Sequence, residues 1–579
     1  MTWTQLTNPL HHLGLSALVA ASPIAFIFWA LIIRKMKGHI VSLLTVLAGW
    51  LIAVLVYGMP ARLALMSLAD GALYGLFTIC WIILGVLFLY NLTVVAGQFE
   101  VIRNFMASVT TDRRLQAVLI AFAFGAFLEG AAGFGAPVAI TASMLVGLGF
   151  EVPERTGSLA GRRTGTVLPG RGSGSMLPEQ RTGVSSGPVY AAGLCLIANT
   201  APVAFGSIGI PITVASQVSG LPEMAISKMV GQTLPVISLI LPFYLVQIIV
   251  GWKKTWEIWP VLLLAGGSFA IVQFITSNYI SPMLPDVLSG LTSIICLILY
   301  FRWRGIGGRR AGEDGGQGGA DGQWGGADGW RVLRAWSPFI IMTFLVILWG
   351  IPAIKDGLNA VGQFKTALPG LDAHAIRQAD GHPLIIKPFT FSWLSNVGTA
   401  IFLAALLSMP IIGASGRMVL QALLVTLRQL KIPAVTIASV MGFAYVVNNS
   451  GMSITMALAL ATTGSLFPFF SPMLGWLGVF LTGSDTSSNA LFSKLQYGSA
   501  VSIGVDPSVT VGANVAGGVT GKMISPQSVA VGAAAVGLAG RESELFRFTV
   551  RHSFIMLAIV CILTTLQAYA AHFLHIFGL

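Results

Sequence analysis

The sequence predicts an all-α, polytopic integral membrane protein with about 12 to 14 transmembrane helices. Three observations predict this fold class: 55% of the 579 residues are hydrophobic, only 9% are charged, and the mean hydropathy is +0.82. Soluble proteins usually contain about 25% charged residues. Apolar runs of about 17–25 residues recur along the chain, whereas a β-barrel would show weakly alternating segments of about ten residues.

The runs follow one another from the first residues to the last, with some too short to cross a membrane alone. Short runs must join their neighbours or belong to broken helices. The clearest runs are Gly14–Ile33, Ile40–Gly58, Gly71–Val95, Ala117–Phe127, Gly187–Gly206, Val230–Val250, Ile258–Thr276, Val287–Phe301, Pro338–Pro352, Leu394–Ile412, Ala434–Val447, Ile454–Gly464 and Phe554–Leu574.

The formal net charge of +12 comes from Lys and Arg residues in short loops beside the apolar runs. This is the positive-inside pattern of membrane proteins, not a nucleic-acid-binding face. It places the loop Arg34–His39 in the cytoplasm and the N-terminus outside. Because no Lys or Arg precedes Gly14 and no small-residue cleavage site follows, the first run is predicted to be a retained span rather than a signal peptide.

Two polar stretches divide the chain. Residues 302–335 are rich in Gly and carry both charge signs, which predicts a flexible cytoplasmic linker between a first membrane half, 1–301, and a second, 336–579. Residues 151–186 are rich in Gly, Arg, Ser and Thr and cannot cross lipid. They are predicted to be an insertion in a loop.

An internal repeat supports that insertion. Phe127–Gly130 (FLEG) resembles Phe480–Gly483 (FLTG) at an offset of 353 positions, and Ala198–Ala201 (ANTA) resembles Ala513–Ala516 (ANVA) at an offset of 315. The offsets differ by 38, close to the length of the 151–186 stretch. The sequence therefore predicts two repeated transport units, the first of them interrupted, as is common in secondary transporters.

The first candidate site is a glycine-rich break around Glu129. Three glycines and Pro137 follow within an apolar run, which weakens a helix and predicts a break. Breaks at membrane depth survive where they line a polar cavity or are packed by protein, and intramembrane acids usually face a pathway. Glu129 is a candidate for proton coupling, and the alternative is an acid at the end of an interfacial loop.

The second copy carries a dense polar cluster at its break. Asp485 is the second candidate for proton coupling, three residues beyond the position that matches Glu129. The hydroxyl and amide groups around it suit a hydroxy acid, while the alternative is a polar turn outside the membrane. The candidate substrate-binding residues of this cluster are Ser484, Thr486, Ser487, Ser488 and Asn489.

Lys522 is a further candidate for binding the carboxylate of a substrate. Its counterpart in the first copy is Ser207, so a cation is present in only one copy. A lysine within a membrane needs such a partner to offset its burial, although an interfacial loop lysine is the alternative. Asn199, Thr200 and Asn514 are matched or neighbouring polar residues that either bind substrate, cap a helix or bond a neighbouring helix.

Several function classes lack their motifs. No GxGxxG follows a strand, and no GxxxxGK[ST] or HExxH occurs, so neither an ATP-driven pump nor an enzyme is predicted. The four cysteines lie in apolar runs without metal-ligand spacing. No cofactor and no metal are therefore expected, and the expected partners are a small solute and the lipid bilayer.

Four stretches resemble the signature sequences of the bacterial L-lactate permease family. They are Phe127–Thr141 (FLEGAAGFGAPVAIT), Asn199–Gly206 (NTAPVAFG), Phe480–Phe492 (FLTGSDTSSNALF) and Gly517–Ser528 (GGVTGKMISPQS). The resemblance covers nearly the whole chain outside the two polar stretches. Members of that family join the runs on either side of 151–186 almost directly, and their central linker contains less glycine.

The resemblance implies a proton-coupled symporter of the bacterial inner membrane that takes up L-lactate, with glycolate as a second substrate. It does not imply which residues bind. A sodium-coupled carboxylate carrier is the alternative, because broken helices with Ser, Thr and Asn also coordinate sodium. The substrate would bind between the two repeats, its carboxylate held by Lys522 and helix N-termini.

Overall fold

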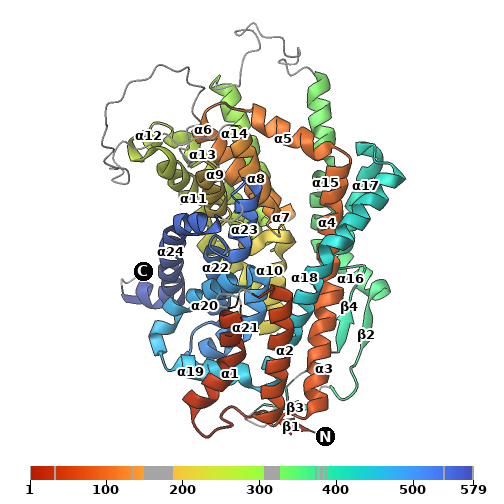
Figure 1. Ribbon diagram of the computed structural model, residues 1–579, viewed down its shortest axis with the longest axis vertical. Coiled ribbons are helices and arrows are strands. Elements are labelled where there is room, and N and C mark those ends of the chain that lie inside the picture. Colours follow the sequence, from red (N-terminus) through yellow and green to blue (C-terminus); the bar gives the residue numbers. More distant parts are fainter. Residues whose placement is uncertain are drawn as a thin grey trace, which may run out of the picture.

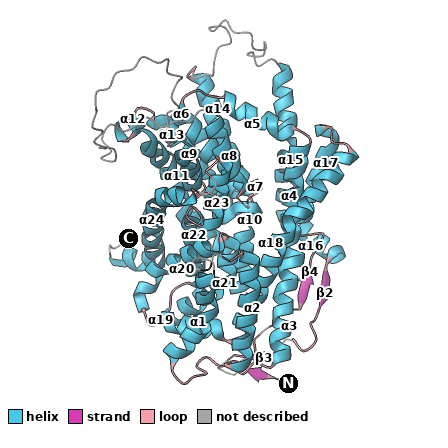
Figure 2. Ribbon diagram, in the orientation of Figure 1, coloured by secondary structure: helices cyan, strands magenta, loops and turns pink. Residues whose placement is uncertain are grey.

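The computed structural model is built almost entirely of helices, with only short strands (Figure 2). It describes residues 2–576 except 31–33, 35, 132, 134, 149–186, 306–325, 372–374, 379–382, 385, 387 and 539–540. The predicted insertion at 151–186 lies outside the described residues. Within them, two short ribbons pair β1 (Trp3–Thr4) with β3 (Ile376–Arg377) in parallel, and β2 (Phe364–Thr366) with β4 (Phe389–Phe391) antiparallel.

The helices of the first half are arranged as Figure 1 shows. They are α1 (Leu13–Phe28), α2 (Gly38–Leu55), α3 (Ala61–Leu73), η2 (Tyr74–Ile79), α4 (Cys80–Val95), α5 (Gln98–Ser108), α6 (Arg113–Gln116), η3 (Ala117–Phe124), α7 (Gly125–Ala131), α8 (Ala136–Gly147), α9 (Gly187–Ala198), η4 (Val203–Phe205), α10 (Gly206–Ser219), α11 (Glu223–Val250), α12 (Trp252–Trp256), α13 (Trp259–Ile275), η5 (Thr276–Ile280) and α14 (Pro285–Trp303).

The second half continues in the same style. Its helices are α15 (Gly326–Gly350), α16 (Pro352–Gly362), α17 (Val397–Ile412), α18 (Gly416–Ser450), α19 (Met452–Ala461), η6 (Gly464–Leu466), α20 (Phe467–Thr482), α21 (Asp485–Ile503), α22 (Pro507–Lys522), α23 (Pro526–Ala535) and α24 (Glu542–Ile576).

The all-α membrane fold predicted from hydropathy is confirmed. Among the described residues, ten helices are long and apolar enough to cross a membrane, or eleven if the pair Gly187–Ala198 and Val203–Ser219, bent by 62°, counts as one span. Four shorter apolar helices are also present. Several of the predicted 12 to 14 runs, such as Ile454–Gly464, correspond to these short helices rather than to full spans.

Three long helices, α20, α21 and α22, fall in no predicted run. The candidate span Gly464–Thr482 contains Pro468 and Pro472, which interrupt its apolar pattern, although Pro468 lies in the first turn of α20, where no backbone donor is lost. Helix α22 is rich in Gly, Thr and Ser, and almost all of its residues are buried. Protein rather than lipid surrounds α22, so hydropathy does not identify it.

The Gly-rich linker is shorter at its C-terminal end than predicted. Helix α15 begins at Gly326, so residues 326–335 are helical, and residues 306–325 lie outside the described part of the chain. The Arg334 guanidinium donates a hydrogen bond to the carbonyl of Ile411 at the end of α17. This contact holds the start of α15 against α17, which packs beside it.

The helix breaks occur at corresponding places in the two predicted copies. A break separates α7 from α8 in the first copy, and another separates α20 from α21 in the second. The non-helical turn Ser207–Gly209, just before Pro211, corresponds to the break between α22 and α23 just before Pro526. The first copy has a further bend, between α9 and η4, where the matching part of the second copy is the continuous helix α22. We call α6–α11 the first unit and α20–α24 the second.

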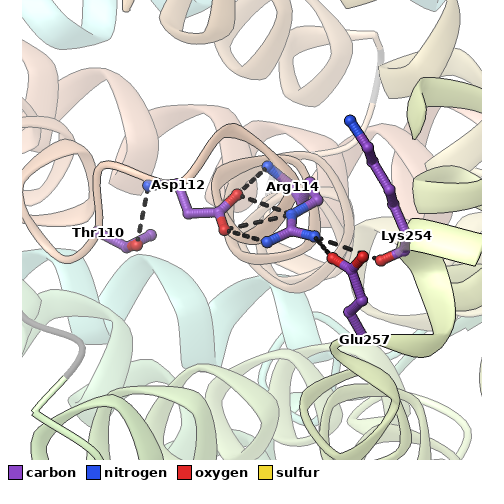
Figure 3. Close-up of polar contacts among 5 residues, drawn as sticks. All are labelled: Thr110, Asp112, Arg114, Lys254 and Glu257. Carbon is purple, nitrogen blue, oxygen red and sulfur yellow. Dashed lines mark hydrogen bonds and ion pairs between the residues drawn. The ribbon is translucent and has the colours of Figure 1, made fainter.

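Arg114 ties the start of the first unit to the turn before α13 (Figure 3). Its guanidinium pairs with Asp112 at 2.9 Å and with Glu257 at 3.1 Å, and it donates to the Lys254 carbonyl at 3.3 Å. Asp112 also caps α6 by accepting from the Arg114 amide. Burial alone raises the pKa of the Asp112 carboxyl, but the hydrogen bonds and charge of Arg114 outweigh burial and lower that pKa. The pair is therefore ionised at neutral pH.

Helices α20 and α22 of the second unit pack backbone against backbone. A side-chain carbon at Gly475 would overlap the Asn514 carbonyl, one at Gly517 would overlap the Pro472 carbonyl, and one at Gly521 would overlap the Trp476 carbonyl. Small residues at helix interfaces permit this approach in membranes. The position of α22 therefore depends on these glycines.

We expect Gly517→Ala to destabilise the protein by about 1–3 kcal/mol, because the added methyl group meets backbone that cannot rotate away. The measurement is the thermal unfolding midpoint of the detergent-solubilised protein. The control is Gly267→Ala in α13, where the nearest atom to an added Cβ is 4.0 Å away. Equal midpoints for the two variants would contradict the assigned role of the glycine contacts.

Candidate functional site

The first break places Glu129 inside the protein. Helix α7 ends two residues after Glu129, and Gly133 and Gly135 then adopt positive φ angles of 59° and 83° before α8 begins. The Glu129 side chain is only 3% exposed, and its Oε2 atom has no hydrogen-bond partner among the described residues. Glu129 therefore lies in the last turn of a helix and is buried by protein.

The second break of the first unit lies against this one. Ser207 and Ile208 have positive φ angles of 49° and 59°, a conformation that costs about 1–2 kcal/mol per residue outside glycine. A Cβ at Gly133 would overlap the Ser207 hydroxyl, and a Cβ at Gly206 would lie 3.1 Å from the Glu129 carboxylate. Two breaks of the first unit thus meet at Glu129, and strained backbone of this kind is typical of functional sites.

Asn199 and Thr200 belong to this first group rather than to the second. Both are buried, and the Asn199 amide lies beside the Glu129 carboxylate. The Asn199 Nδ2 and Thr200 Oγ1 atoms have no hydrogen-bond partner among the described residues. Their side chains therefore remain available to a ligand or to water, while the backbone N–H of Asn199, directly after α9, donates to the Cys195 carbonyl of that helix at 3.0 Å.

The break of the second unit brings Asp485 and Lys522 together. Gly483 ends α20 with a φ of 70°, and the Lys522 ammonium donates to its carbonyl at 2.9 Å. Asp485 is 3% exposed and packs against Gly518, one turn before Lys522. Lys522 acts electrostatically on both Asp485 and Glu129. The charge of one ammonium group therefore acts on the candidate acids of both units.

A chain of amide groups extends from Asp485 into the protein. The Asn489 Nδ2 donates to Asp485 at 3.4 Å and to the Pro211 carbonyl at 3.2 Å, and the Asn514 Nδ2 donates to Asn489 Oδ1 at 2.8 Å. Gln496, which sequence reasoning missed, donates to Asn514 Oδ1 at 3.3 Å. The bond to Pro211 crosses from one unit to the other, so these amides join the two units.

Ser484, Thr486 and Ser487 line a cavity of about 780 Å³. Helices α2 and α18 form one side of this cavity, and the break between α20 and α21 forms the other. Its walls combine those hydroxyl groups and the Gln527 amide with apolar side chains such as Leu491. A small solute with both polar and apolar parts fits such a surface.

Ser488 does not join that group. Its hydroxyl is fully buried and donates to the Gly475 carbonyl at 3.1 Å, which fastens α21 to α20. The predicted substrate-binding residues are thus divided three ways: cavity walls, the Glu129 region, and helix contacts. Sequence proximity alone did not separate these environments.

A second cavity, of about 630 Å³, lies further along the same helices. On α18 it is lined by Tyr445, Asn448 and Asn449, and on α21 by Lys494. Asp70 lies in the last turn of α3 and also lines this cavity. The two cavities occupy consecutive stretches of α18 and α21.

Asp286 is the buried acid that sequence reasoning missed. It follows Pro285 in the first turn of α14, a position that by itself indicates only an ordinary helix N-terminal acid. The side chain is 1% exposed, and neither carboxylate oxygen has a hydrogen-bond partner among the described residues. No sequence signal distinguishes it from an exposed acid, because its burial depends on α7 packing against α14.

Comparisons with known proteins agree on one family. The sequence model of the L-lactate permease family matches residues 16–158 and 182–571. The L-lactate permease of Bacillus subtilis (strain 168) is 49% identical, and the glycolate permease GlcA of Escherichia coli (strain K12) is 47% identical. The L-lactate permease of Escherichia coli (strain K12) is 46% identical. Each alignment covers 98% of this chain and 98% of the relative.

Two solved transporters show a more distant similarity. The YdaH transporter of Alcanivorax borkumensis is 12% identical, with a TM-score of 0.43 over 88% of this chain and 89% of that chain. MtrF of Neisseria gonorrhoeae is 13% identical, with a TM-score of 0.40 over 86% of this chain and 82% of that chain.

The family consists of permeases, so the prediction that the chain is not an enzyme is confirmed. Together with the membrane-spanning helices, the match also confirms a multi-pass protein of the bacterial inner membrane. The chain belongs to the L-lactate permease family.

Proposed function

We propose that the protein is a proton-coupled symporter for L-lactate and related 2-hydroxy monocarboxylates such as glycolate. The observation that carries this proposal is the near full-length similarity to relatives named L-lactate permease and glycolate permease. Lactate and glycolate share a carboxylate and a 2-hydroxyl group and differ by one methyl group. A site for both must bind the two polar groups and tolerate the methyl.

The first cavity has the groups that such a substrate needs. Thr486, Ser484 and Ser487 offer hydroxyl groups for the 2-hydroxyl, and Leu491 offers an apolar surface for the methyl. Lys522 lies at the adjoining break and uses one of its three donors on Gly483, which leaves two for a carboxylate. The substrate carboxylate would pair with this ammonium group.

Buried acids supply the proton-coupling part of the proposal. Glu129 and Asp485 are buried at breaks in the two units, and each has an unpaired carboxylate oxygen among the described residues. A charged acid without full pairing is costly within a membrane, so proton binding there is favourable. Moving a proton together with the substrate anion leaves no net charge to carry across the bilayer.

In proteoliposomes, we expect radiolabelled L-lactate to enter faster when the outside is acidic, because proton entry drives the anion inward. A protonophore should abolish the acceleration, and a sodium gradient imposed at equal pH should have no effect. Uptake that follows the sodium gradient and ignores the pH gradient would instead establish the sodium-coupled alternative.

Glu129→Gln keeps the size of the side chain but cannot release a proton. We expect it to abolish gradient-driven accumulation while sparing exchange of lactate between two loaded compartments, which need not cycle the proton. Glu100→Gln, which neutralises an exposed acid in α5, serves as the control and should accumulate lactate normally. Full accumulation by Glu129→Gln would exclude Glu129 from coupling and make Asp485 the next acid to test.

Thr486→Val removes one hydroxyl group from the cavity at nearly constant volume. Loss of one hydrogen bond of about 0.5–1.5 kcal/mol should raise the apparent KM for lactate by roughly two- to tenfold. Propionate, which lacks the 2-hydroxyl group, should compete with lactate for binding equally well in the wild type and in the variant. The control is Thr462→Val at an exposed position after α19. An unchanged preference for lactate over propionate would exclude Thr486 from reading the hydroxyl.

A further inference from the structure

Asp286 and Glu129 lie on two helices in direct contact. Gly130, the neighbour of Glu129, lies so close to α14 that a Cβ there would be 2.8 Å from the Asp286 Cβ. Gly290, one turn beyond Asp286, is equally close to the Phe127 backbone. The Glu129 carboxylate acts electrostatically on Asp286. Two glycines thus bring two buried carboxyl groups together from different parts of the chain.

The space around the two acids contains polar atoms without partners. Both Asp286 oxygens and the Glu129 Oε2 atom lack a hydrogen bond of good geometry within the described residues, and so do Asn199 Nδ2 and Thr200 Oγ1. The nearest amides are those of Gln273, beside Asp286, and Asn199, beside Glu129. All four side chains are at most 4% exposed. Buried polar atoms of native proteins are nearly always paired, so these atoms are placed to bind a proton or a small polar ligand.

Few other charges act on this cluster. Helix α15, whose Trp336 and Phe339 contact Phe127 of α7, carries Arg331 and Arg334, and α14 itself carries Arg302. The other described elements in close contact with α7 or α14, namely η3, α8, α9, η4, α10, α13 and η5, contain no Asp, Glu, Lys, Arg or His. Their other titratable groups are Tyr190, Cys195 and Tyr279. Lys522 of α22 acts on Glu129 and is shared with Asp485. The same ammonium group therefore acts on two of the three buried carboxyl groups, Glu129 and Asp485.

We propose that Glu129 and Asp286 form a carboxyl pair that binds the coupling proton between them, with Asp286 as the second proton acceptor. Two adjacent buried carboxylates cannot both be ionised, so the pair holds one proton and one negative charge, which Lys522 balances. This inference rests on the proposed symport and adds to it the residue that completes the proton site.

Substrate and proton binding then favour each other. A substrate carboxylate that pairs with Lys522 takes over the ammonium group that had stabilised the charge on the pair. The pair consequently binds a second proton more readily. By linkage, a proton on the pair strengthens substrate binding by the same factor, which is the thermodynamic basis of symport.

The test measures proton uptake when L-lactate is added to purified protein in weakly buffered detergent solution containing a pH indicator. The wild-type protein should take up about one proton, at most, for each lactate bound. It should also bind lactate more tightly as the pH falls. Asp286→Asn should lose most of the uptake, and its lactate affinity should vary little with pH. Proton uptake by Asp286→Asn equal to that of wild type would overturn the proposal.

The matched control is Asp70→Asn, another buried aspartate that lines the second cavity and is on α3. It should keep wild-type proton uptake, and a loss equal to that of Asp286→Asn would also overturn the proposal. If the Asp286→Asn variant does not elute as a single species, or does not bind lactate at acid pH, the Asp286→Glu variant tests the role of Asp286 instead. That variant keeps a titratable group and must retain the uptake.

The two levels of the proposal fail in different ways. Wild type that shows neither lactate-linked proton uptake nor a response to a pH gradient would refute the proposed symport. If lactate binding is coupled to proton uptake in both the wild type and the Asp286→Asn variant, only the role of Asp286 is refuted.

Discussion

The structure depends on satisfying backbone groups where helices break inside the membrane. Lipid offers no hydrogen bonds, so each break needs a donor from elsewhere in the protein. Lys522 donates to the carbonyl of Gly483, Asn489 to that of Pro211, and Gln273 to that of Ala201. The polar side chains that make the interior look like a binding site are thus also what allows the breaks to exist.

This double role constrains where function can arise. Lys522 holds the end of α20 and at the same time supplies positive charge for the buried acids. Asn489 contacts the first unit through Pro211 and the second through Asn514. A solute that accepts a hydrogen bond from Lys522 or Asn489 also changes the hydrogen bonding of a backbone carbonyl at a helix break. Binding and helix geometry are therefore linked through the same hydrogen bonds.

Much of this organisation could be predicted because it is local in the sequence. Long apolar runs show the membrane class, and the glycines and proline after Glu129 show a break. The buried positions of Glu129 and Asp485 follow from acids placed at such breaks.

The rest depends on contacts between distant segments. Asp286 reads as an ordinary helix start until α7 covers it, and α22 reads as polar until protein surrounds it. Asn199 and Ser484 share a polar character in the sequence, yet the fold directs them to different sites. Packing of this kind leaves no periodic pattern in a single chain.

The two cavities have walls in common. Helix α18 lines the first cavity from Ile432 to Phe443 and the second from Tyr445 to Asn449, and α21 passes from Leu491 in one to Lys494 in the other. Phe443 and Tyr445 on α18, and Leu491 and Lys494 on α21, are each separated by one helical turn or less. A tilt of α21 against α18 about the point between the cavities would therefore widen one cavity as it narrows the other.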